Sequence, residues 1–91
     1  MNWRRTRPSW RKVMREVEDA TRDLREAAEL IGGPLQVAMP PRARERALHA
    51  LAEGMAHMVA AQSALTSGDR EAAVQASRQV RACARRAKGQ P

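Results

Sequence analysis

Apolar side chains recur at alternating steps of three and four residues in three separate stretches of this sequence. The first stretch consists of Trp10, Val13, Val17, Ala20, Leu24, Ala27 and Ile31. This spacing places the apolar side chains on one face of an α-helix and polar residues on the other. Ser9 can accept hydrogen bonds from the first free amides, and Gly32-Gly33-Pro34 stops the helix. The pattern therefore predicts an amphipathic helix over residues 9–31.

Two further stripes have the same period. The second consists of Leu48, Leu51, Met55, Met58, Gln62 and Leu65, and the third of Ala73, Ala76, Val80, Cys83 and Ala87. Pro40-Pro41 can open the second helix, because a proline in the first turn loses no hydrogen bond. Gly68 closes it, and Asp69 can cap the third helix. We therefore predict helices over residues 41–67 and 69–88.

The links between these helices predict the topology. The link Ser67-Gly68-Asp69 is short enough to make the second and third helices an antiparallel hairpin. We expect an all-α, antiparallel three-helix bundle over residues 9–88, with a basic arm at residues 1–8 and a tail at residues 89–91. The alternative is an extended first helix that pairs with a second chain, and self-association of the bundle is left open.

The composition predicts a thin core. The chain of 91 residues is long enough for one domain, but 18 of its apolar residues are alanine, and it has no Phe or Tyr. Alanine buries little surface, and a small domain gains little from a single core. The helices must therefore pack closely with modest stability, or cover themselves with a partner or with copies of the same chain.

Several function classes find no support in the residues. The sequence has no glycine-rich phosphate loop and no set of nucleophile, base and acid, so we expect neither an enzyme nor a cofactor. No apolar run follows the first cations as it would in a secretory signal, and no uncharged run could span a bilayer. The lone Cys83 allows no internal disulfide, and its place in the apolar stripe predicts a small buried side chain. We expect a cytoplasmic protein.

Charge is distributed unevenly along the chain, whose formal net charge is +7. Residues 1–15 carry six cations and no acid, whereas residues 16–31 carry six acids and two arginines. Residues 68–91 are basic again, with six cations and two acids. A strong positive field on a small protein indicates an anionic partner.

The basic residues of the N-terminal segment are the first candidate site. They are Arg4, Arg5, Arg7, Arg11, Lys12 and Arg15. Guanidinium groups pair with phosphates, and Trp3, which lies outside the first apolar stripe, could stack on an unpaired base. The alternative is a solvated terminus in which Trp10 only begins the core stripe.

A second cationic row lies on the predicted third helix. Arg78, Arg81, Arg85 and Lys88 follow one another at steps of three, four and three, and no acid interrupts them after Glu71. We expect this ridge on the outer face of the bundle, where it suits phosphates spaced along a nucleic acid or an acidic partner helix. The alternative is an ordinary solvated helix face, whose charges contribute little.

One row of the second helix resembles a metal site only superficially. Glu45, His49, Glu53 and His57 recur at every fourth residue. Helical metal sites draw ligands from facing helices as well, so we expect a polar face with pairs four residues apart and no bound metal.

Two functions of different class follow from these features. The first is a non-catalytic accessory protein that binds DNA or RNA mainly through phosphate contacts. The second is a helical adaptor, inhibitor or complex subunit that docks on an acidic protein surface. We favour nucleic acid, because the charge is most one-sided in the two segments that the bundle should leave unneutralised. Membrane attachment through Trp3 and Trp10 ranks behind both.

Overall fold

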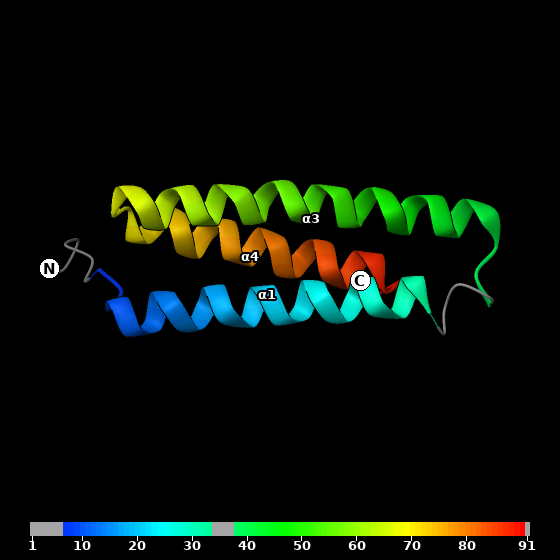
Figure 1. Cartoon of the computed structure of the whole chain (residues 1–91), viewed down its shortest axis with the longest axis horizontal. Helices are drawn as coiled ribbons and strands as arrows, with labels where there is room; N and C mark the ends of the chain where they lie inside the picture. The colour runs from blue at the N-terminus through cyan, green and yellow to red at the C-terminus, as the bar shows by residue number, and fades with distance from the viewer. Residues whose placement is uncertain (1–6, 34–37, 91) are drawn as a thin grey trace, which may run out of the picture.

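The structure is a computed structural model that describes residues 7–33 and 38–90. It consists of α1 (Trp10–Gly32), α3 (Pro41–Ser67) and α4 (Arg70–Ala87), which run up, down and up (Figure 1). The three-helix bundle predicted from the sequence is confirmed, and every predicted helix end lies within one residue of the observed one.

The predicted caps account for the positions of the helix ends. The Ser9 hydroxyl accepts a hydrogen bond from the Lys12 amide at 3.1 Å, and the Asp69 carboxylate accepts one from the Ala72 amide at 3.0 Å. Gly68 follows α3 with φ at +77°, a left-handed conformation that only glycine adopts without strain. This turn reverses the chain within two residues and sets α4 antiparallel to α3.

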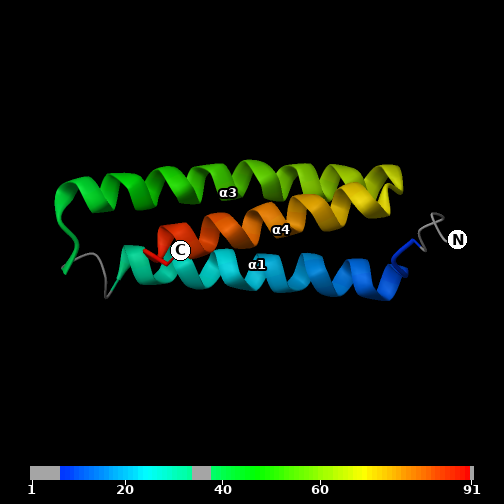
Figure 2. The same ribbon diagram turned by 180° about the vertical axis from the view of Figure 1, so that it is seen from behind.

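α4 packs along both other helices, whereas α1 and α3 contact each other less extensively (Figures 1 and 2). One part of the core consists of Ala27, Ile31, Ala47, Ala50, Leu51, Ala84 and Ala87, and another of Val13, Ala64, Ala73 and Val74. The largest fully buried side chains belong to Val13, Val80, Cys83 and Ser77. The core is thin, as the composition predicts, and its small side chains allow the helices to approach closely.

The helices approach one another closely at Gly54, in the middle of α3. A Cβ atom at this position would lie 2.8 Å from Leu24 Cδ1 of α1 and 3.2 Å from Cys83 Cβ of α4. The first distance is shorter than real Cβ contacts, so any larger residue must displace a neighbour. All three helices therefore meet where α3 has no side chain.

The predicted apolar stripe of α3 is wrong in its rotation about the helix axis. Leu48 and Met55 were expected in the core, but they are 48% and 62% exposed. The buried residues of α3 are instead Ala47, Ala50, Leu51, Gly54, Ala61 and Ala64. The physical reason is that α3 can approach two helices at once only through its line of small residues, which turns the larger side chains outward.

The stripes of α1 and α4 are confirmed, except at the first residue of α1. Trp10 is 39% exposed and Leu24 is half-buried, while the other members of both stripes are buried. α4 also buries Val74, Ser77 and Ala84, which the pattern did not predict. The Ser77 hydroxyl donates to the Ala73 carbonyl at 2.8 Å, which removes the cost of burying it.

None of the helices in residues 7–33 and 38–90 combines the length and the apolar character that a membrane crossing requires.

Substitution of Gly54 by valine tests the close approach of the three helices. The added side chain would overlap Leu24 and the backbone-proximal Cβ of Cys83. We expect Gly54→Val to lower the free energy of unfolding by about 1–3 kcal/mol, the usual cost of overpacking a core. Urea denaturation followed by circular dichroism measures this change.

Gly32→Ala is the matched control, because a Cβ at Gly32 meets nothing within 4 Å. Alanine favours the helical conformation over glycine by up to about 1 kcal/mol, so this variant should be as stable as the parent or more stable. A Gly54→Val protein as stable as the parent would show that the helices do not meet as described.

Candidate nucleic-acid interface

The cations around the start of α1 remain open to solvent. Arg7, Arg11, Lys12 and Arg15 are all exposed. Among residues 7–33 and 38–90, none of these four side chains forms an ion pair with an acid. We call these four residues the N-terminal cluster. Arg4, Arg5 and the predicted stacking residue Trp3 lie outside the described residues.

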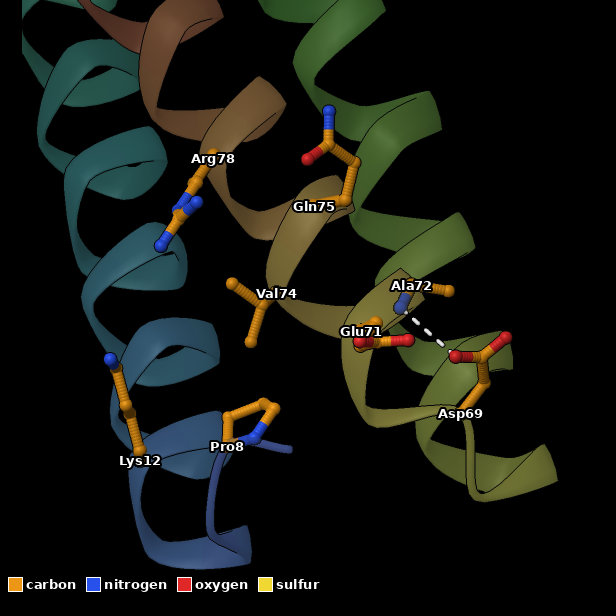
Figure 3. Close-up of a pocket in the computed structure, with 8 residues that line it drawn as sticks. All are labelled: Pro8, Lys12, Asp69, Glu71, Ala72, Val74, Gln75 and Arg78. Carbon is orange, nitrogen blue, oxygen red and sulfur yellow. Dashed lines mark hydrogen bonds between the residues drawn. The ribbon is translucent and has the colours of Figure 1, made fainter. Parts of the chain in front are cut away.

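The beginning of α4 lies beside this cluster and shares an open groove with it (Figure 3). The groove measures about 650 Å³ and is lined by Pro8, Lys12, Asp69, Glu71, Ala72, Val74, Gln75 and Arg78. Arg78 extends from α4 toward α1, and Lys12 lies on α1, whereas Asp69 and Glu71 lie on the side nearer α3. Arg78 is exposed and has no ion-pair partner in the described part of the chain, so it extends the N-terminal cluster onto α4.

Arg70 belongs to the same end of the bundle, although its position in the sequence did not single it out. Its guanidinium donates to the Pro8 carbonyl at 3.2 Å and lies 4.8 Å from the centre of the Trp10 ring. A cation–π contact of this kind contributes about 0.5–1 kcal/mol at an exposed site. It holds the residues just before α1 against the start of α4. The parallel course of α1 and α4, which follows from an up-down-up bundle, would have predicted that Trp10 and Arg70 are neighbours.

The expectation that the whole ridge of α4 lies unpaired on the outer face is wrong for Arg81. Its Nε donates to the Asp23 carboxylate of α1 at 3.0 Å, and the two side chains are 37% and 22% exposed. A partly exposed pair of this kind contributes at most about 1 kcal/mol. The cause is the register of the two helices, which turns the middle of the ridge toward the acidic part of α1.

The other members of the ridge differ in their surroundings. Lys88 lines a second pocket together with Glu26, Glu29 and Leu30, so carboxylates of α1 lie close to it. Arg85 is exposed and forms no ion pair within the described residues. The four ridge cations therefore do not form one uniform surface, and only Arg78 is continuous with the N-terminal cluster.

Arg22 lies just beyond the N-terminal cluster and is neutralised within α1. It donates to Asp19 at 3.2 Å and to Asp23 at 3.4 Å. The hydrogen bond to Asp23 and the charge of Asp19 raise the pKa of Arg22 above its ordinary value. The strongly positive surface therefore ends where the acidic residues of α1 begin.

The row of acids and histidines on α3 was expected to form pairs within its own helix, but Glu53 pairs with another helix. Glu53 accepts a hydrogen bond from Arg86 of α4 at 3.3 Å, so it pairs across helices rather than along its own. Among the described residues, no three His, Cys, Asp or Glu side chains gather closely enough to hold a metal ion.

Cys83 is a buried residue of the core, as predicted, with only 1% of its surface exposed. Burial raises the pKa of the thiol, and the positive charge of Arg86, whose guanidinium donates to Sγ at 3.2 Å, partly opposes this rise. A thiol with a raised pKa and no access to solvent is a poor nucleophile.

Comparison with protein-family models, with curated proteins and with solved structures finds no significant match to this chain.

The surroundings of Cys83 predict slow alkylation of the native protein. Iodoacetamide should react with Cys83 many times more slowly in buffer than in urea, because both burial and the raised pKa suppress the thiolate. Mass spectrometry at timed intervals measures this ratio. Equal rates in the two conditions would place the thiol at the surface and contradict the packing of α4.

The raised pKa of Cys83 also predicts how the stability of the protein depends on pH. The folded state keeps the thiol proton at pH values where the unfolded chain has lost it, so the free energy of unfolding should fall as pH rises above the ordinary thiol pKa. In the Cys83→Ala variant, the free energy of unfolding should fall less over the same rise in pH.

Proposed function

We propose that this protein is a non-catalytic helical accessory protein that binds nucleic acid mainly through phosphate contacts. The observation that supports this proposal is the N-terminal cluster together with Arg78, five exposed cations without ion-pair partners in the described part of the chain. Arginine and lysine side chains of this kind neutralise phosphates and release the counterions that surround a nucleic acid.

Phosphate contacts fit this surface better than base readout does. Four of the five cations lie on two helices that run parallel within one bundle, and Arg7 lies just before α1. The groove beside Lys12 and Arg78 is also lined by Pro8, Ala72, Val74 and Gln75 and by the acids Asp69 and Glu71. Neither helix stands out from the bundle as a reading helix does when it enters the major groove. The binding should therefore depend strongly on salt and weakly on sequence.

An acidic protein surface is the second candidate, and the same cations support it. A helical adaptor would use the N-terminal cluster against carboxylates instead of phosphates. Binding to nucleic acid near physiological salt distinguishes the two candidates, since positive charge alone is enough for binding only at low salt.

Removal of three charges from the N-terminal cluster tests the proposed interface. The variant Arg11→Gln, Lys12→Gln, Arg15→Gln should bind duplex DNA and RNA more weakly than the parent. If all three cations contact phosphates, the slope of log K against log salt should also become shallower by about 2 to 3 for duplex DNA. Fluorescence anisotropy over a salt series measures both the affinity and the slope.

A matched control removes the same charge from the opposite end of the bundle. Arg42→Gln, Arg44→Gln, Arg46→Gln changes the net charge equally but lies at the start of α3 (Figure 1). We expect this control to keep most of the salt slope. Equal losses in the two variants would show that net charge alone drives binding, and no binding of the parent at low salt would overturn the nucleic-acid proposal.

A further inference from the structure

Among the described residues, several exposed large apolar side chains lie on the side of the bundle between α1 and α3, away from α4. Val59 is 65% exposed, Met55 62% and Met14 43%. Scattered apolar residues are normal on a protein surface, but a contiguous patch indicates an interaction site. We call the patch formed by Met14, Thr21, Ala28, Met55 and Val59 the α1–α3 face.

A contact between the side chains of α1 and α3 locates this face. The Thr21 hydroxyl of α1 donates to Met58 Sδ of α3 at 3.6 Å, which marks the seam between the two helices. α1 reaches α4 from a different side, through Asp23, and α3 reaches it through Glu53. Met14 and Ala28 of α1, and Met55 and Val59 of α3, lie on the sides of their helices that point away from Asp23 and Glu53. All four are exposed.

The α3 half of the face lacks charge. Residues 54–68 contain no Asp, Glu, Lys or Arg, in a chain of which 30% is charged. The exposed residues around Met55 and Val59 include Ala52, Ala56 and Ser63, which are small. A solvated helix face normally carries charged side chains, so this surface is suited to a close contact with another neutral helix.

The α1 half is bordered by two charges of opposite sign. Glu18 and Arg25 are exposed along this edge, and within the described residues neither forms an ion pair. A second α1 laid antiparallel sets Glu18 of each copy near Arg25 of the other, whereas a parallel one sets like charges together.

The apolar residues of α1 fit the same antiparallel register. Met14 lies seven residues before Thr21, and Ala28 lies seven residues after it. A twofold axis at Thr21 thus places the long side chain of Met14 on the small Ala28 of the second copy, and Glu18 close to Arg25 of the second copy.

The same axis crosses α3 near Met58, because Thr21 and Met58 are in contact. It therefore passes beside Met55 and Val59, the two most exposed large apolar side chains among the described residues. The neutral part of α3 then contacts the same part of α3 in the second copy, and Glu18 and Arg25 of α1 face residues of opposite charge in the second copy.

From this agreement we propose that the α1–α3 face binds a second copy of this chain in an antiparallel twofold arrangement, with α1 on α1 and α3 on α3. The contact is isologous, so each patch is covered by the identical patch of the partner. The dimer does not depend on nucleic acid, and its association is therefore measured on the protein alone.

The first test compares two single charges placed on α3. Val59→Glu puts two carboxylates beside the twofold axis, and the 65% exposure of Val59 means that the bundle itself should tolerate the change. Ala60→Glu is the matched control, because Ala60 is exposed but points about 100° away around the helix. Sedimentation velocity over a concentration series measures association, and circular dichroism verifies that both variants are folded.

We expect the parent to dimerise, Val59→Glu to raise the dissociation constant at least about tenfold, and Ala60→Glu to leave it nearly unchanged. A parent that stays monomeric up to about 100 µM would overturn the proposal. Equal effects of the two glutamates would overturn it as well.

The second test exchanges charges between copies. Glu18→Arg alone sets two arginines together at each contact, and Arg25→Glu alone sets two glutamates together, so each variant should dimerise less than the parent. When the two variants are mixed, both contacts of a mixed dimer again join an arginine to a glutamate. At one contact both side chains are the introduced ones, and at the other they are the native Glu18 and Arg25.

The mixed dimer should therefore be tighter than the dimer of either variant alone. A mixture no tighter than its components would overturn the antiparallel register, even if the parent dimerises.

Discussion

Three helices can meet at Gly54 only because no side chain stands between Leu24 of α1 and Cys83 of α4. This close approach requires the rest of the inward surface of α3 to be small as well, and alanines occupy most of it. The helix is then rotated so that Leu48, Met55 and Val59 face outward. One steric constraint therefore determines both the thin core of the bundle and the apolar surface outside it.

The same packing decides which cations remain available. Because α4 lies against the acidic part of α1, Arg81 pairs with Asp23 and Lys88 lies near Glu26 and Glu29. The N-terminal cluster precedes the first acid of α1, and none of its four side chains forms an ion pair within the described residues. Arg7 and Lys12 line pockets that also contain Asp69 and Glu71. The positive surface is thus concentrated at one end of the bundle, and the ridge of α4 contributes to it mainly through Arg78.

Helix boundaries could be predicted from the sequence because they depend on local chemistry. Ser9, Gly68 and Asp69 act within one turn of their own positions, and the cap contacts are those expected. The rotation of α3 could not be predicted in this way, since hydrophobicity favours the line through Leu48 and Met55. Only the distance between helices shows that the line of small residues is the buried one.

The candidate site likewise has one part that could be predicted from the sequence and one part that depends on contacts between helices. A run of cations without acids is visible in the sequence, and the described members of the N-terminal cluster are exposed as expected. The loss of Arg81 to Asp23 and the stacking of Arg70 on Trp10 depend on the register between α1 and α4. Charge periodicity within one helix contains no information on that register.

Self-association would strengthen the binding of a long polyanion, because a dimer carries two N-terminal clusters. Arg11, Arg7, Lys12 and Arg15 all lie outside the residues that define the α1–α3 face, so a dimer would leave the N-terminal cluster open to phosphates. The antiparallel arrangement also places the two N-terminal clusters at opposite ends of the dimer. Two modest sites on one rigid body bind a long polyanion more tightly than either site alone, because the second contact becomes intramolecular. A bundle too small to build one strong site would in this way gain affinity by using its weak site twice.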